Sequence, residues 1–353
     1  MRKVLLIHAG MVQHYRCAIY SYLSSYLRCS GYQLVVLAGG VEGDCQDADF
    51  TVLKRNLNLL AILACLVKVK PKCVIFFTGL RSMWLYPSIV LLKVLKIGSI
   101  YWGHGVNLQK VYSHRRVYSW LHGMSDAIVL YANHLRDNIH GKYQQKVFIA
   151  NNTLNLSDYP GKVIDEELKK DILNKYGINT PTNVVFVGRV QKRKRVLDLV
   201  EAFSGIEATN IGLIIIGPDP EGIMDAVDHP RVFKIGPLYG HEARELLSVS
   251  SICCIPGSVG LSIVDAFHFG LPLITERVNH GPEIMYLKDE TNGFVLPKGD
   301  IRGIRQKILE LVQDSKKLRS FSLSAQATIA REATIDGFCL GFKEALDFVN
   351  CKT

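Results

Sequence analysis

The sequence lacks several features that would place it in a familiar class of protein. No apolar run makes a good membrane span, because residues 57–67 are too few and residues 84–102 are interrupted by lysines. The first apolar run, residues 4–7, is shorter than a signal peptide requires. The nine cysteines have no metal-ligand spacing and lie mostly in apolar segments, so we expect reduced core residues of a cytosolic protein.

Recognition sequences for other partners are also missing. No Gly-x-Gly-x-x-Gly follows the first expected strand, which disfavours a nicotinamide dehydrogenase. No zinc knuckle, helix-turn-helix pattern or aromatic RNA-binding signature is present, so nucleic acid is the least favoured partner.

Acidic residues are scarce in the N-terminal half. Residues 1–180 contain 22 Lys and Arg against 11 Asp and Glu, whereas residues 181–353 contain 20 against 21. This asymmetry predicts an anionic partner for the first half, such as a lipid surface or a lipid-linked phosphate.

The hydrophobic pattern predicts two α/β domains. Short apolar runs alternate with helical spacing at residues 4–7, 34–37, 73–77, 99–102 and 127–130, and the alternation restarts at residues 184–187, 212–216, 232–235, 252–255 and 273–275. We expect two doubly wound parallel sheets, with domains at 1–158 and 159–334. The amphipathic segment 335–353 is expected to pack back onto the first domain.

A cationic loop follows the strand expected at residues 184–187. Gly188 ends the apolar run, five cations lie within residues 189–195, and helical spacing begins at Val196. Ligands of open α/β sheets bind at the carboxyl ends of strands, where Arg and Lys favour phosphate. Arg189 and Lys194 are the predicted phosphate ligands, while the other three cations are expected to be exposed; the alternative is a solvated charge cluster.

A glycine-bearing loop occurs at the corresponding place in residues 255–272. It is expected to join a strand end to a helix, with Gly260 and Leu261 offering backbone N–H groups and Asp265 in the helix's first turn. Two such loops in one domain suggest a nucleoside diphosphate held between them.

In combination these segments resemble the retaining family 4 glycosyltransferases of GT-B architecture, which have two facing Rossmann-like domains and an inter-domain cleft. Gly188-Arg189-x4-Lys194 is similar to the family's diphosphate loop, and Gly260-Leu261, Asp265-Ala266 and Gly270-Leu271-Pro272 are similar to its second segment. Two glutamates usual in the family are replaced here by Gly257 and Asp265. The chain looks like bacterial polysaccharide-assembly members that carry a Pro-Gly-x-x-Gly-Leu variant.

The resemblance implies a role for each matching position. Asp265 would bind the ribose hydroxyls, Glu283 would meet a sugar hydroxyl or cap a helix, and His104 would position the donor sugar without acting as a nucleophile. The base would lie near Gly236, Pro237 and Leu238, and Gly10 would approach the donor, while His14 and Arg16 would hold the acceptor.

The expected function is therefore metal-independent transfer of a sugar from a UDP- or GDP-sugar to a glycan or lipid-linked acceptor, with retention. A cytoplasmic protein, peripheral at the inner face of the cell membrane, would fit the basic first domain. Two alternatives remain open: a non-catalytic nucleotide- or lipid-binding subunit, and a nucleotide-sugar epimerase. Asp47-Ala-Asp49 matches a metal-binding pattern but is interpreted as a turn.

Overall fold

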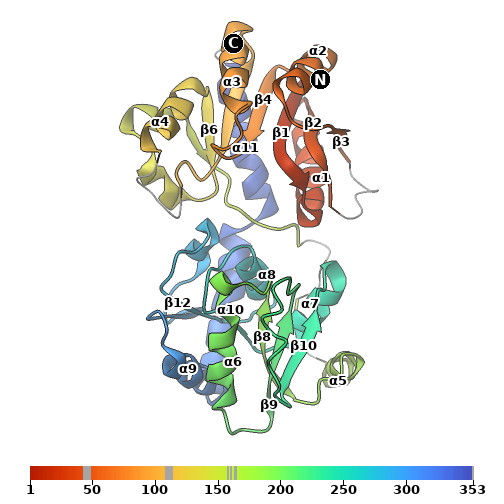
Figure 1. The fold of residues 1–353 in the computed structure, drawn as a ribbon, viewed down its shortest axis with the longest axis vertical. Helices are drawn as coiled ribbons and strands as arrows, with labels where there is room; N and C mark the ends of the chain where they lie inside the picture. Colours follow the sequence, from red (N-terminus) through yellow and green to blue (C-terminus); the bar gives the residue numbers. More distant parts are fainter. Residues whose placement is uncertain (43–48, 108–113, 157–158, 160, 163–164, 352–353) are drawn as a thin grey trace. The chain divides into compact units, whose positions relative to one another are not determined.

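The computed structural model describes residues 1–42, 49–107, 114–156, 159, 161–162 and 165–351, and divides the chain into two compact units (Figure 1). Unit 1 comprises residues 1–155 and 333–353, and unit 2 comprises residues 156–332. The two boundaries lie three and two residues before the positions expected from the sequence. Each unit is a doubly wound α/β domain with an all-parallel sheet, as predicted.

The sheet of unit 1 has seven strands in the order β3-β2-β1-β4-β5-β6-β7. Their bounds are β1 Arg2–Val12, β2 Tyr32–Val41, β3 Thr51–Lys54, β4 Cys73–Phe77, β5 Gly98–Gly103, β6 Ala127–Leu130 and β7 Val147–Ile149. The central strands are buried on both faces, which explains why their sequences are unbroken apolar runs.

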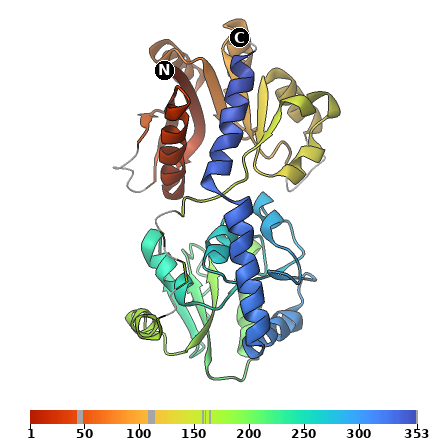
Figure 2. The same ribbon diagram turned by 180° about the vertical axis from the view of Figure 1, so that it is seen from behind.

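Helices cover both faces of this sheet. Figure 1 shows α2 Leu59–Val69, α3 Leu85–Val94 and α4 Arg115–Met124 over one face. Figure 2 shows α1 His14–Cys29 and α11 Ile335–Asn350 over the other. The buried rings of Phe338 and Phe342 on α11 lie 5.8 and 4.9 Å from the Trp102 ring of β5, so the last helix supplies part of the first unit's core.

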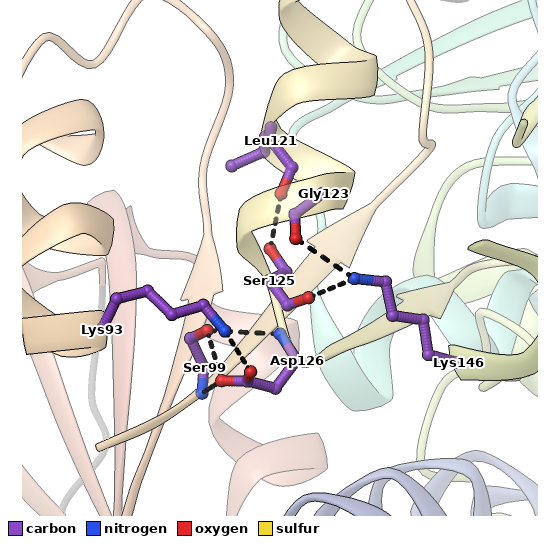
Figure 3. A network of polar contacts seen from close by, with 7 residues as sticks. All are labelled: Lys93, Ser99, Leu121, Gly123, Ser125, Asp126 and Lys146. Carbon is purple, nitrogen blue, oxygen red and sulfur yellow. Dashed lines mark hydrogen bonds and ion pairs between the residues drawn. The ribbon is translucent and has the colours of Figure 1, made fainter. Parts of the chain in front are cut away.

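A polar network fixes the amino edge of this sheet (Figure 3). Asp126, just before β6, accepts hydrogen bonds from the backbone N–H and the hydroxyl of Ser99 at 2.9 Å each, and forms an ion pair with Lys93 of α3. Lys146 donates to the carbonyl oxygens of Gly123 and Ser125 at the end of α4. These contacts lie at the edge opposite the candidate residues described below, so their role is structural.

The sheet of unit 2 has six strands in the order β10-β9-β8-β11-β12-β13. The strands are β8 Thr182–Val187, β9 Ile211–Ile216, β10 Val232–Gly236, β11 Ile252–Cys254, β12 Leu273–Glu276 and β13 Gly293–Leu296. The helices are α5 Glu166–Lys175, α6 Val196–Ser204, α7 Gly240–Val249, α8 Ser262–His268, α9 Ile301–Gln313 and α10 Ser315–Glu332. Short 3-10 turns occur at Asn133–Asn138, Gly141–Lys146, Lys192–Lys194 and Pro282–Tyr286.

The cysteines only partly match the expectation of reduced core residues. Five free thiols are buried, namely Cys65, Cys73, Cys253, Cys254 and Cys339. Cys29 and Cys351 are exposed, and Cys17 takes part in a disulfide bond, so the expectation is wrong for these three. Within the described residues, no helix has the length and apolar character needed to cross a membrane.

Candidate functional site

The loops at the carboxyl edge of the unit 2 sheet are fastened to one another by backbone hydrogen bonds. The Gly188 N–H, after β8, donates to the Ile216 carbonyl at 2.9 Å, and the Gly217 N–H donates to the Gly236 carbonyl at 2.8 Å. A Cβ at Gly217 would lie 2.1 Å from the Gly188 carbonyl oxygen, so this approach requires glycine. The loops after β8, β9 and β10 therefore form one rim.

The cationic loop and the glycine-bearing loop lie side by side on this rim. The Gly257 N–H donates to the Lys194 carbonyl and the Ser258 N–H donates to the Arg193 carbonyl, both at 3.0 Å. A Cβ at Gly257 would lie 2.2 Å from the Arg193 carbonyl oxygen. The family that the sequence resembles usually has a glutamate at this position, whereas here the backbone of residue 257 contacts the backbone of the cationic loop.

The glycine-bearing loop is also held from the side of β12. The Val259 N–H donates to Nδ1 of His280 at 3.1 Å, while the Val259 carbonyl accepts from the Gly281 N–H at 2.7 Å. Gly260 differs from Gly257, because a Cβ at Gly260 would meet no atom within 4 Å. Packing within the described part of unit 2 therefore leaves room for a side chain at Gly260.

Lys194 is the buried cation of the charged loop. Its side chain is only 6% exposed, and its Nζ lies 3.7 Å from where a Cβ of Gly188 would be. Burial, followed by the nearby Arg193, lowers the pKa of Lys194 from 10.5 to about 8, while the Glu283 carboxylate opposes the shift. Lys194 thus stays largely protonated at neutral pH at the end of β8, where a ligand phosphate is expected.

The other cations of this loop divide differently from the prediction. Arg189, Lys192 and Arg193 are exposed. Arg195 was also expected to be exposed but is half-buried, because it forms ion pairs with Asp198 and, at 3.1 Å, with Oε2 of the fully buried Glu276 at the end of β12. Arg195 thus anchors the loop to the sheet, which leaves Arg189 and Lys194 as candidates for a ligand.

The Asp265 carboxylate on α8 is hydrogen-bonded to a neighbouring helix. Its Oδ1 accepts a hydrogen bond from Nε of Arg244 on α7 at 3.1 Å. The Arg244 guanidinium lies 3.7 Å from the centre of the Tyr159 ring, so its position is fixed from two sides. Burial raises the pKa of Asp265, and the Arg244 charge counteracts this rise.

The remaining unit 2 candidates occupy the same carboxyl edge. Gly236 ends β10 with φ of 83°, followed by exposed Pro237 and half-buried Leu238. Leu261 directly precedes α8, and Glu283 is buried in the 3-10 turn after β12. The structure therefore brings every predicted nucleotide-sugar residue of unit 2 to one edge of the sheet.

The unit 1 candidates lie at the carboxyl edge of its own sheet. Gly10 was expected after the first strand, but β1 continues to Val12, and Gly10 lies with φ of 90° in an irregularity of its pairing with β2. His14 is exposed at the start of α1, whereas Arg16 is only 4% exposed. Two residues predicted to act together on an acceptor thus have different surroundings.

Arg16 and His104 belong to one aromatic cluster. The Arg16 guanidinium lies 5.0 Å from the Trp102 ring centre and 5.1 Å from that of Phe77, with the Tyr15 and Tyr131 rings at 5.6 and 5.8 Å. His104 packs on Tyr131 at 4.8 Å between ring centres. Burial and the Arg16 charge lower the pKa of His104 to about 4, so its ring is neutral at pH 7.

Hydrogen-bond donors in this cluster lack acceptors. Arg16 Nε and Nη1, Trp102 Nε1 and His8 Nε2 are buried without a hydrogen-bond partner among the described residues. His8 Nδ1 lies 2.7 Å from the Tyr20 hydroxyl, and burial lowers the His8 pKa to about 4. When Tyr20 donates to Nδ1, Nε2 carries the proton, so all four groups are donors.

Asp49, which lies just before β3, contacts two side chains of α1. Its carboxylate pairs with Arg28 at 2.7 Å and accepts from the Ser25 hydroxyl at 2.6 Å, whereas Asp47 lies outside the described residues. Among the residues that the structure describes, no group of three His, Cys, Asp or Glu side chains is placed to hold a metal ion.

Sequence reasoning missed Arg195 with Glu276, Arg244 with Tyr159, and His280. Each of these residues contacts another that is distant in the sequence, so the local sequence pattern could not predict the contact. The only available hint was charge, because a carboxylate that ends an apolar strand, as Glu276 does, requires a cationic partner.

Alanine substitutions at Gly257 and Gly260 test whether the glycine-bearing loop binds a ligand. Gly257→Ala should lower the free energy of unfolding by about 1–3 kcal/mol, because its Cβ would overlap the Arg193 carbonyl. Gly260→Ala should leave stability within about 0.5 kcal/mol yet weaken UDP binding about tenfold if ligand occupies the open side of the loop. Urea unfolding and isothermal titration measure the two effects, and unchanged UDP affinity in Gly260→Ala would remove Gly260 from the site.

Comparison with known proteins shows what the chain is similar to. Residues 181–314 match the family model described as Glycosyl transferases group 1. No curated protein sequence matches the chain.

Several solved structures share the fold along the whole chain. A glycosyltransferase from Rickettsia africae ESF-5 has a TM-score of 0.80 at 15% identity, covering 99% of this chain and 98% of its own. HepE from Anabaena, solved with UDP, has a TM-score of 0.78 at 16% identity, covering 98% and 100%. WaaG, a glycosyltransferase involved in lipopolysaccharide biosynthesis, has a TM-score of 0.65 at 16% identity, covering 97% and 98%. The chain thus has the GT-B fold, and its residues 181–314 are similar to the group 1 glycosyl transferases.

Proposed function

We propose that this protein is a retaining glycosyltransferase that moves a hexose-type sugar from a UDP- or GDP-sugar to a glycan or lipid-linked acceptor. The observation that carries the proposal is the buried Lys194 ammonium beside Gly188, between two hydrogen-bonded loops at the carboxyl edge of the unit 2 sheet. The fold of HepE, which binds UDP and UDP-glucose, supports UDP as the nucleoside diphosphate.

The proposed chemistry follows from where charge develops. Breaking the bond between sugar and phosphate leaves a nucleoside diphosphate, and Arg189 and Lys194 neutralise the added negative charge without a metal ion. Each charge-assisted hydrogen bond contributes about 1.5–3 kcal/mol. Asp265 binds the ribose hydroxyls with the carboxylate oxygen that Arg244 leaves accessible, and Glu283 binds a hydroxyl of the sugar.

In the front-face route that the family resemblance implies, the leaving phosphate accepts the proton of the acceptor hydroxyl. His104 positions the donor sugar as a neutral ring, which agrees with its low pKa. Gly10 gives the donor close access to backbone.

Arg16 binds an anionic group of the acceptor in this proposal, with His14 at the surface nearby. Removing a guanidinium from water costs several kcal/mol, and no ion pair within the described part of the chain offsets this cost. Each cation–π contact stabilises the folded protein by about 0.5–2 kcal/mol, and this contribution decreases with distance. A ligand oxyanion would offset the charge of Arg16.

The proposed cellular role is assembly of a surface polysaccharide or glycoconjugate by a cytoplasmic protein at the inner face of the cell membrane. The excess of cations in residues 1–180 supports an anionic membrane surface as partner of unit 1. The fold shared with WaaG supports a role in glycan assembly.

One observation favours a second candidate, a non-catalytic nucleotide-binding subunit. The place of the family's first glutamate is filled by the contact between Gly257 and the Arg193 carbonyl, so that carboxylate is missing from the sugar side. Release of UDP from UDP-glucose by the purified protein distinguishes the enzyme from the subunit, because the subunit would bind the donor without turnover.

Binding of nucleoside diphosphates tests the donor site. UDP or GDP at 100 times its dissociation constant should stabilise the protein by about 2.7 kcal/mol, seen as an upward shift of the melting temperature. The double change Arg189→Ala and Lys194→Ala should abolish the shift, whereas Lys192→Ala, an exposed cation of the same loop, should preserve it. A protein that responds to neither UDP nor GDP would contradict the donor assignment.

The low pKa of Lys194 predicts how affinity depends on pH. Only the protonated amine attracts the diphosphate, and the free protein loses this proton as the pH rises through about 8. The dissociation constant for UDP should therefore be flat between pH 7 and 8 and increase about tenfold per unit above that. Titration calorimetry measures this profile. The break should persist in Lys192→Ala and disappear in Lys194→Arg, whose side chain stays charged; a flat profile in the wild type would exclude Lys194 from the phosphate site.

Arg16→Met distinguishes a ligand-binding arginine from a structural one. If Arg16 serves a ligand, replacing its unpaired buried charge by an apolar chain of similar length should stabilise the free protein by about 1–3 kcal/mol and abolish sugar transfer. If Arg16 instead serves only to pack against the aromatic rings, the same change should lower the free energy of unfolding. Thermal unfolding of the ligand-free protein reads out the sign.

A further inference from the structure

We propose that the outer face of α2, α3 and α4 is the surface by which the protein binds an anionic lipid bilayer. This inference deepens the membrane partner of the proposed function by naming the elements that touch the lipid. Two independent features of unit 1 support it: apolar side chains exposed along adjacent helices, and a chain segment, residues 50–125, that carries cations and no acidic residue.

Helices α2 and α3 each expose apolar residues along one side, and α4 exposes one aromatic residue. On α2, Leu60 and Val67 are 77% and 72% exposed and lie two turns apart. On α3, Pro87, Val90 and Val94 are exposed at helical spacing, with Val94 at 74%. On α4, Trp120 is exposed one turn after Arg116. A helix of a water-soluble domain normally has polar residues at such positions, so these stripes indicate contact with an apolar partner.

A groove of about 810 Å³ lies between these stripes. It is lined almost wholly by apolar side chains of the three helices, among them Leu63, Tyr86, Leu91, Val117 and Trp120, with Arg116 at its side. The Tyr86 and Trp120 rings lie 5.8 Å apart. Exposed aromatic rings next to aliphatic side chains and arginine are typical of surfaces that enter the headgroup region of a bilayer.

The charged residues of the segment that contains these helices all have one sign. Residues 50–125, which include all three helices, contain eleven Lys and Arg and no Asp or Glu. Lys68 and Lys70 lie at the end of α2, Lys96 follows α3, and Arg115 begins α4; all are exposed, and none has an ion pair in the described part of the chain. Lys93 differs, because Asp126 pairs with it.

An anionic bilayer fits this combination better than a second copy of the chain. Two copies joined through this face would bring like charges together, which opposes association. A bilayer that contains phosphatidylglycerol offers negative headgroups to the cations and hydrocarbon to Leu60, Val67 and Val94.

Vesicle co-sedimentation tests the surface. Wild-type protein should bind vesicles of phosphatidylglycerol and phosphatidylcholine in a 1:3 ratio at least tenfold better than vesicles of phosphatidylcholine alone, and 0.5 M NaCl should weaken the binding. Leu60→Glu with Val94→Glu should reduce binding at least tenfold. Leu340→Glu is the matched control, because Leu340 is exposed on α11 over the other face of the same sheet, and it should bind like the wild type.

UDP binding in solution is measured on the same samples, and the Leu60→Glu and Val94→Glu variant should retain it. Loss of vesicle binding with normal UDP binding therefore supports this surface, while failure to bind UDP would contradict the donor site and leave this result standing. Wild-type protein that does not sediment with anionic vesicles would overturn the proposal, as would a double variant that binds like the wild type. A wild-type dimer in light scattering that the double variant dissociates would instead assign the face to a second copy.

Discussion

The donor side of this protein depends on two hydrogen bonds between backbones. Through them Gly257 and Ser258 hold the carbonyl groups of Arg193 and Lys194, and the contact exists only because residue 257 has no side chain. The cationic loop consequently takes its shape from β11 as well as from β8. Arg195 fastens the same loop to Glu276 of β12, so three adjacent strands together fix where the Lys194 ammonium lies. The loop is held in place before any ligand arrives, which lowers the ordering cost of binding.

The cations near the two carboxyl edges fall into two groups according to whether a carboxylate balances their charge. Arg195 and Arg244 each face a carboxylate, and their neighbours restrict them from a second side, so they serve as anchors. Lys194 and Arg16 are more deeply buried, yet the charge of Lys194 is only partly balanced and Arg16 has only aromatic rings and phenol groups around it. Buried charge without full compensation reduces stability, and such groups concentrate where a ligand supplies the missing charge. Each unit thus carries one such cation at the carboxyl edge of its sheet.

The sequence predicted the fold well wherever periodicity was strong. Strands β4 and β6 begin and end at the predicted residues, because each follows a polar residue that ends the preceding loop. The short strands β3, β7 and β13 were missed, since a few residues at a sheet edge show little alternation. Within the site, the pattern located the loops but could not identify which cation is buried. That depends on the left-handed turn at Arg195 and on Glu276, which is brought close only by folding. The burial of Arg16 likewise requires rings from four separate segments.

The route of the chain has a consequence for how the molecule is made. Helix α11 supplies Phe338 and Phe342 to the core around Trp102, yet it follows the whole of unit 2 in the chain. During synthesis, unit 2 can therefore complete its packing as soon as it leaves the ribosome, whereas the Trp102 ring of unit 1 lacks its two α11 neighbours until later. In this interval the nascent unit 1 exposes aromatic surface, and a chaperone that shields it would act on the side that α11 later covers.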